Sequence, residues 1–216
     1  MARREGINYP KFKDQFAVMD FEAEPMPVLS LYPMPPEQRI EDWRMTFTGV
    51  AGERVSLGWQ EIRCLPRVRE RAPLVCQIFN WSEEPLVEGV RLADVVALAG
   101  LDDAEQAHWA FHAADGFYFE VLPRSMALDP RTLLVFGLDG EPLPRQHGGP
   151  LRLWVPFLQG YKSVKWLTTA RAYRRDPVGI KRLLGQSRTA TLGTEGQVKA
   201  DIVVARPMLG ESLVDI

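Results

Sequence analysis

Apolar and polar residues alternate at a spacing of two in several short segments, which is the pattern of half-buried strands. On this basis we expect strands at residues 43–50, 54–57, 109–113, 117–121, 133–137, 151–156 and 164–173. A more continuous apolar segment at 73–81 fits a buried strand that leads into a loop. Glycine, proline and Asp-Gly pairs separate these segments and favour turns. The strands are therefore predicted to be short and closely connected.

Helical spacing of apolar residues is confined to a few short segments. Residues 59–65 form an amphipathic stretch that Pro66 would end, and residues 91–99 form another that Gly100 would cap. A helical turn is expected at 124–127 and a short helix at 176–184. Together with the strands, these segments predict an α+β fold with mixed, short-stranded sheets and a few short helices.

The spacing of apolar and polar residues divides the chain into three parts. Its 216 residues fit one domain with an additional arm. Residues 1–40 are rich in proline, methionine and aromatic residues with little periodicity, which predicts an N-terminal extended arm on the surface. Residues 41–175 are expected to form the domain, and 176–216 a C-terminal helix and arm packed on it. The β-prone stretch 200–208 is expected to pack on its own domain, while strand addition to a second copy or a partner stays open.

Composition narrows the functional classes. Hydrophobic residues make up 46% of the chain and the net charge is −2. This balance excludes an overall basic surface for nucleic acid or an anionic membrane, so any anion site has to be local. No apolar run approaches the ~18 residues of a membrane span, and no apolar stretch follows the pair Arg3 and Arg4 as a secretory signal requires. We expect a cytoplasmic protein, or a periplasmic one if the start is processed or replaced.

The two cysteines, Cys64 and Cys76, do not make a disulfide framework. A bridge between them is the less favoured alternative, because cytoplasmic thiols stay reduced. Cys64 lies in a helix-like segment, where we expect a buried small side chain. Cys76 lies in the apolar segment at 73–81 and remains available for chemistry.

Residues 147–166, here called the cradle segment, combine glycines with basic and hydroxyl side chains. Gly148 and Gly149 allow close approach of the backbone to a ligand, because glycine lacks a Cβ. Arg152 offers a fork of donors to a phosphate or a planar heterocycle. Lys162 and Lys165 place ammonium groups on either side of a serine. This set suits a phosphate-bearing ligand with a polar ring system, although a turn-rich surface with scattered basic residues is the alternative from spacing alone.

The cradle segment reads HGGPLRLWVP and then GYKSVKW, and it resembles the signature of the oxidoreductase molybdopterin-binding domain family. Shorter runs agree with that family: DGEPLP at 139–144, ADGF at 114–117 and EGVRL at 88–92. The resemblance covers about residues 27–174. It implies the sulfite-oxidase-type molybdopterin-binding fold and a molybdenum cofactor, Mo-molybdopterin.

The resemblance also assigns residues. Those that match the positions holding the pterin and its phosphate are His147, Arg152, Ser163, Val164 and Lys165, with Ala113 at a further contact. Relatives often carry Ser or Thr at that last position. The alanine implies that this contact is made by the backbone alone or is missing.

The metal ligand implied by the resemblance is the thiolate of Cys76, a soft donor suited to molybdenum. In many relatives the ligand lies four residues before a Trp-Ser pair, and here Gln77 stands four before Trp81. Alignment on Glu88-Gly89-Val90 instead keeps Cys76 at a plausible spacing. The two alignments differ by one residue, so in a strand the side chains of Cys76 and Gln77 would point to opposite faces. A β-bulge, which inserts one residue, would reconcile the two alignments. Both a Cys76 ligand and a site without a protein thiolate stay open here.

The residues near Cys76 depart from those of sulfite oxidases, which carry clustered arginines near the metal. Where sulfite oxidases carry arginine close after the ligand cysteine, this chain has Ile78 to Trp81, and Phe136 stands where they have tyrosine. The pocket is expected to be more apolar and aromatic, with core packing as an alternative for its aromatic residues. Its expected walls are Phe79, Asn80, Trp81 and Phe136.

Two functional hypotheses follow. The first is a molybdopterin-dependent oxidoreductase that transfers an oxygen atom on a small-molecule substrate other than sulfite. The second is a non-catalytic or cofactor-deficient binding module on the same fold. Because no C-x-x-C-H haem motif is present, the first requires a separate electron-transfer partner, a haem or flavin protein.

Overall fold

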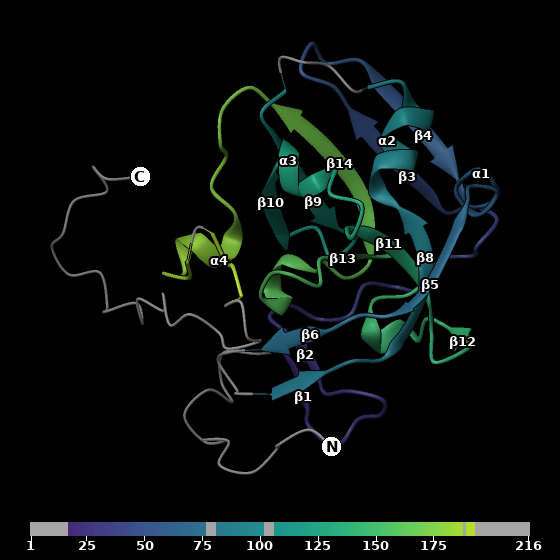
Figure 1. The fold of residues 1–216 in the computed structure, drawn as a ribbon, viewed down its shortest axis with the longest axis vertical. Coiled ribbons are helices and arrows are strands. Elements are labelled where there is room, and N and C mark those ends of the chain that lie inside the picture. The colour runs from purple at the N-terminus through teal and green to yellow at the C-terminus, as the bar shows by residue number, and fades with distance from the viewer. Residues whose placement is uncertain (1–16, 77–80, 102–105, 188, 193–216) are drawn as a thin grey trace, which may run out of the picture.

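The computed structural model describes residues 17–76, 81–101, 106–187 and 189–192. Two sheets form the body of the molecule (Figure 1). The predicted α+β class with short strands and few helices is confirmed. Within the described residues, no helix has the length and hydrophobicity needed to cross a membrane.

The first sheet has five strands in the order β10-β9-β14-β3-β4. Their bounds are β3 Arg44–Thr48, β4 Arg54–Gly58, β9 His108–Ala113, β10 Phe119–Pro123 and β14 Leu167–Tyr173. Only the β14–β3 pair is parallel. Strand β14 lies between β9 and β3, so the end of the predicted domain is at the centre of this sheet, directly after the cradle segment.

The second sheet runs β12-β11-β8-β5, and β13 also pairs with β11. Its strands are β5 Arg67–Arg71, β8 Leu86–Arg91, β11 Leu133–Leu138, β12 Glu141–Pro142 and β13 Arg152–Trp154. Strands β5 and β8 were absent from the expectations. Strand β5 is an exposed edge with the sequence RVRER, and Gly89 interrupts the apolar pattern of β8, so neither carries a strong strand signal.

Strand β11 lies between two hydrophobic clusters. Leu134 and Phe136 belong to the larger cluster, which joins both sheets with α1 Trp59–Arg63 and α2 Leu92–Ala99. Leu133 and Val135 belong to the smaller cluster on the other face. All six residues of β11 are buried. This explains the continuous apolar run at 133–137, since a strand covered on both faces has no polar side.

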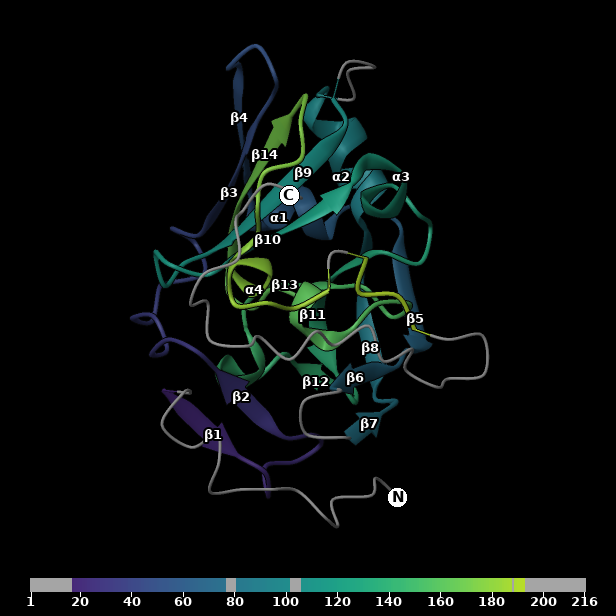
Figure 2. The same ribbon diagram turned by 90° about the vertical axis from the view of Figure 1, so that its left-hand side faces the viewer.

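The expected extended arm contains a hairpin instead. Strands β1 Val18–Asp20 and β2 Val28–Ser30 are antiparallel. Phe21 and Met26 are almost completely buried in the smaller cluster. The arm therefore supplies part of the hydrophobic core of the second sheet. Figure 2 shows β1 and β2 at the same end of the molecule as β6 and β7.

The segment expected as one strand at 73–81 forms two. Strand β6 Leu74–Cys76 pairs with β7 Trp81–Glu83, and Cys76 lies directly opposite Trp81. The short helices are α3 Arg124–Ala127, as expected, and α4 Ile180–Leu183, which is shorter than the predicted helix at 176–184. The predicted β-prone stretch at 200–208 lies outside the described residues.

We predict that Gly89→Ala destabilises the protein. A Cβ at Gly89 would lie 2.3 Å from the Leu134 carbonyl oxygen in the centre of the second sheet. Because backbone cannot move away cheaply, the free energy of unfolding should fall by about 1–3 kcal/mol, measured by urea denaturation. Gly58→Ala is the control, because its Cβ would meet only the flexible ends of Glu61 and Arg44. Equal losses in the two variants would contradict this packing.

Candidate functional site

The cradle segment folds back on itself between the two sheets. It begins in the 3₁₀ turn η3 Arg145–His147, continues through β13 and η4 Gly160–Lys162, and leads into β14. The N–H of Trp166 donates to the Gly148 carbonyl at 3.1 Å. The N–H of Val155 donates to the Ser163 hydroxyl at 3.0 Å. These bonds bring the two halves of the sequence motif together.

The glycines of the cradle segment allow it to pack closely against the protein itself. Gly148 has a φ of +105°, and a Cβ there would lie 2.8 Å from the Cβ of Lys165. A Cβ at Gly160 would lie 3.0 Å from the Val75 carbonyl oxygen, and Val75 forms a parallel bridge with Gln159. Close approach at Gly160 therefore places strand β6, and with it Cys76, beside the cradle segment.

One cavity gathers most of the residues singled out in the sequence. Counted out to solvent, the space within it is about 910 Å³. The predicted residues that line it are Cys76, Trp81, Ala113, Arg152, Ser163 and Lys165. The hairpin arm also contributes to the wall, through residues 26–32 except Val28.

Arg152 is 2% exposed and lines this cavity. Its guanidinium donates to the carbonyl oxygens of His147 at 2.8 Å and Ser163 at 3.0 Å, while Nε has no partner among the described residues. Burial lowers the pKa of Arg152 to about 9. The hydrogen-bond partners of this guanidinium are neutral carbonyl groups and its Nε–H has none within the described chain, so Arg152 can bind an anion.

Lys165 is the second cation of the cavity. The residue is partly exposed, but its ammonium lies inside and donates to the carbonyls of Leu29 and Gln146, each at 3.0 Å. Burial, followed by the charge of Arg152, lowers the pKa of Lys165 well below its ordinary value. Within the described parts of the chain, neither Arg152 nor Lys165 forms an ion pair with a carboxylate. A dianionic phosphate would relieve the repulsion between them.

His147 and Val164 lie behind the cavity wall. Both are completely buried. The His147 carbonyl accepts from Arg152, and its ring Nε2 lies 3.2 Å from the Glu24 carbonyl oxygen. The Val164 carbonyl accepts the N–H of Leu153 at 2.8 Å. In this structure both residues hold the frame that positions Arg152.

Cys76 is half-buried at the end of β6 and lines the cavity together with Trp81. Both cysteines are free thiols, so no Cys64–Cys76 bridge forms. Cys64 is exposed after α1, which corrects the expectation of a buried side chain. Gln77, the other register for the ligand, and the expected wall residues Phe79 and Asn80 lie outside the described residues.

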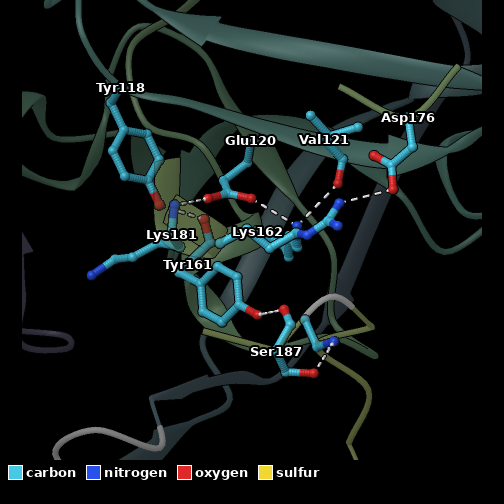
Figure 3. Close-up of polar contacts among 10 residues, drawn as sticks. Tyr118, Glu120, Val121, Tyr161, Lys162, Asp176, Lys181 and Ser187 are labelled. Atoms are coloured by element: carbon cyan, nitrogen blue, oxygen red, sulfur yellow. Dashed lines mark hydrogen bonds and ion pairs between the residues drawn. The ribbon is translucent and has the colours of Figure 1, made fainter. Parts of the chain in front are cut away.

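Two side chains have roles other than those expected. Phe136 packs in the larger hydrophobic cluster, with its ring 5.8 Å from the Trp59 ring, and does not line the cavity. Lys162 is 3% exposed, and its ammonium binds the buried Glu120 carboxylate at 2.7 Å (Figure 3). Lys162 is thus neutralised inside the protein and does not contribute charge to the cavity.

The sequence reasoning missed Tyr118, Tyr161 and Lys181, which also line the cavity. Tyr118 donates to the Tyr161 carbonyl at 2.7 Å, and Tyr161 donates to the Ser187 carbonyl at 2.6 Å (Figure 3). Lys181 belongs to α4. Its local sequence, GIKRLLG, carries no signal for a site, because only the packing of α4 against β10 brings it to the cavity.

Residues 32–180 match the oxidoreductase molybdopterin binding domain. An uncharacterized oxidoreductase of Bacillus subtilis, YuiH, is 30% identical over 142 residues, 65% of this chain and 70% of that protein. The match to a Gluconobacter oxydans protein-methionine-sulfoxide reductase catalytic subunit, MsrP, is also 30% identical and covers 62% of this chain and 48% of that one.

Human mitochondrial sulfite oxidase is 30% identical, and the alignment covers 68% of this chain but 31% of the human protein. The sulfane dehydrogenase SoxCD from Paracoccus pantotrophus has a similar structure, with a TM-score of 0.61 at 22% identity over 75% of this chain and 45% of that chain. The chain therefore spans half or less of these two relatives and of the Gluconobacter protein. The structural likeness establishes the sulfite-oxidase-type fold.

We predict that His147 makes stability depend on pH. Burial lowers the pKa of His147 to about 4, against about 6.5 in an unfolded chain. Between these values the unfolded state binds more protons, so the free energy of unfolding falls as the pH drops from about 6.5 to about 4. His147→Gln should flatten that dependence in urea denaturation. A difference between wild type and variant that stays constant from pH 8 to pH 4 would contradict the assignment.

Proposed function

The chain belongs to the oxidoreductase molybdopterin-binding domain family, and on that premise we propose that it transfers an oxygen atom at a molybdenum centre held by molybdopterin and Cys76. The observation that carries the proposal is one cavity lined by Arg152, Lys165 and the Cys76 thiol. An anion-binding end and a soft metal ligand are the two features that a phosphorylated dithiolene cofactor requires.

The residues present fit Mo-molybdopterin. Arg152 and Lys165 would hold the phosphate, because their charges have only neutral oxygen partners among the described residues. The unused Arg152 Nε, and the Trp81 Nε1 that is also without a partner in the described chain, remain as donors beside the cavity. Ser163 and Ala113 would line the pterin. His147 and Val164 would support it from behind.

Cys76 would supply the protein thiolate to the metal. It lies at the end of β6 opposite Trp81, next to Val75, which bridges to Gln159, and it lines the cavity. When bound, the molybdenum cofactor supplies the two-electron redox change that accompanies oxygen transfer. The chain's own residues bind that cofactor and surround the substrate with Trp81 and the tyrosines Tyr118 and Tyr161.

The proposed substrate is a small oxygen donor such as an S-oxide or N-oxide, and not sulfite. Sulfite is a dianion that needs clustered arginines at the metal, whereas Arg152 is the one arginine among the described residues that line the cavity, and it is assigned here to the cofactor phosphate. In the reduction, the substrate loses its oxygen as water and takes up two electrons and two protons. We propose that a separate haem or flavin protein supplies the electrons.

Molybdenum analysis tests the proposal directly. Protein from a molybdenum-replete host should contain about one molybdenum and one pterin per chain. Cys76→Ser should abolish reduction of S-oxides by the loaded protein, because the thiolate ligand is lost, while circular dichroism stays unchanged. Cys64→Ser is the matched control and should keep activity, since that thiol is exposed away from the cavity. A protein free of molybdenum would favour the non-catalytic binding module.

The phosphate-binding role gives a separate prediction. Arg152→Ala and Lys165→Ala should each reduce retained pterin by about tenfold or more, because a hydrogen bond to a charged group contributes roughly 1.5–3 kcal/mol. Pterin is measured by fluorescence after oxidation. Arg175→Gln removes an exposed charge that does not line the cavity and should leave pterin content unchanged. Full retention in both alanine variants would refute the role.

A further inference from the structure

One segment of the arm forms a wall of the proposed cofactor cavity. Residues 24–35, here called the strap, include strand β2, and residues 26, 27 and 29–32 of the strap line the cavity. The basic side chains that meet the strap lie 110 to 136 residues later in the sequence. This wall therefore stays in place only where tertiary contacts hold it.

Three basic side chains in and just before the cradle segment each meet a backbone carbonyl oxygen of the strap. The pairs are Glu24 with His147 Nε2 at 3.2 Å, Leu29 with the Lys165 ammonium at 3.0 Å, and Pro35 with the Arg145 guanidinium. The strap is thus held at its start, at its middle and at its end by one region of the fold.

A ring contact adds a further attachment near the end of the strap. The Tyr32 ring stacks on the Phe117 ring with 5.2 Å between the centroids. Phe117 is 65% exposed, at a turn fixed by the Asp115 carboxylate, which accepts the N–H groups of Phe117 at 2.9 Å and Tyr118 at 2.7 Å. An apolar ring at the surface is therefore held firmly in the place where it supports Tyr32.

The attachments of the strap differ in their relation to the cavity. Lys165 lines the cavity and is the cation assigned above to the cofactor phosphate. Arg145 is exposed and is not part of the cavity lining. Its carbonyl accepts the indole N–H of Trp166 at 2.7 Å, and Trp166 lines the cavity. Arg145 therefore joins the end of the strap, through its side chain, to the cavity wall, through its backbone.

Closure of the strap and binding of phosphate share the Lys165 ammonium. That ammonium donates to the Leu29 carbonyl and lies 3.4 Å from the Ser30 hydroxyl oxygen. A dianion bound by Arg152 and Lys165 offsets the repulsion between the two cations and so favours the position in which Lys165 holds the strap. Because coupling between two equilibria is reciprocal, a closed strap in turn strengthens binding of the phosphate.

We propose that Arg145 is a positioning residue that holds the strap against the cavity, and that the strap retains the cofactor by closing over its phosphate end. This inference rests on the proposed function. Arg145 acts through Pro35, which is buried and whose carbonyl it binds. Loss of that bond leaves the attachments at Lys165 and His147, so the strap opens more often while the fold persists.

The first test measures opening of the strap by hydrogen–deuterium exchange in full-length protein from a host that makes no pterin. Arg145→Met should speed exchange of the strap amides about fivefold or more, because a charge-assisted hydrogen bond is lost. Arg145→Lys retains a cation that can donate to the Pro35 carbonyl and should restore slow exchange. Phe117→Ser removes the ring that supports Tyr32 and should speed exchange of the same amides independently.

Arg71→Met is the matched control for these variants. Arg71 is also exposed and also donates to a backbone carbonyl, that of Glu84 at 2.9 Å, which lies outside the strap. Its strap exchange should equal that of the parent. Strand β11, buried along its whole length, is the internal reference for global opening. Strap exchange that is unchanged in Arg145→Met and Phe117→Ser, or that rises only in proportion to β11, overturns the proposal.

Inorganic phosphate tests the coupling in the same pterin-free protein. Replacing chloride by phosphate at constant pH and ionic strength should slow strap exchange in the parent about twofold or more relative to β11, because a ligand stabilises the state that binds it. Lys165→Ala should abolish this response. A response that persists in Lys165→Ala, or that is absent from the parent, overturns closure of the strap over the phosphate.

The second test measures release of the cofactor from the molybdenum-loaded protein, as pterin fluorescence after oxidation of the released fraction. Arg145→Met should release pterin about fivefold faster than the parent, and Arg71→Met should match the parent. Urea denaturation of both variants separates this effect from a general loss of stability. Release at the parent rate in Arg145→Met overturns the proposal. A parent without pterin refutes the proposed function, whereas unchanged strap exchange refutes only the present inference.

Discussion

The positive charge enclosed by the cradle segment is the constraint on which the site depends. Arg152 is inside the protein and bonded to the carbonyls of His147 and Ser163, and Lys165 is bonded to carbonyls from two other segments. Neutral oxygens orient these cations without cancelling their charge. Enclosed charge is costly unless it is paired. The phosphate site proposed above would relieve that cost, and a bound dianion would then stabilise the folded chain.

The basic residues of the site differ in whether their charge is paired with a carboxylate. Lys162 is paired with Glu120 and acts in the framework. Arg152 and Lys165 keep their charge for a ligand, and Lys181 is delivered to the cavity by the same Glu120 through its backbone. One buried carboxylate therefore pairs with the side chain of Lys162 and holds the backbone of Lys181.

Close backbone packing connects the distant parts of the sequence. Gly160 lets the cradle segment approach Val75, and this brings Cys76 to a cavity whose charged end lies some seventy-five residues later in the chain. The arm covers the same region, because Met26 and Phe21 fill the smaller hydrophobic cluster while Leu29 accepts from Lys165. The cavity is thus assembled from segments that no local pattern connects.

The sequence by itself determined the α+β class, the helix at α2 and the family, because periodicity and the cradle motif are local properties of the chain. It also singled out Arg152, Ser163 and Lys165, which the fold brings to one cavity. Only the tertiary structure decided that Phe136 packs against Trp59, that Lys162 is neutralised by Glu120, and that Lys181 reaches the cavity. Such roles depend on which side chains come into contact in the folded chain. Contacts between distant segments cannot be read from the residue pattern of either segment alone.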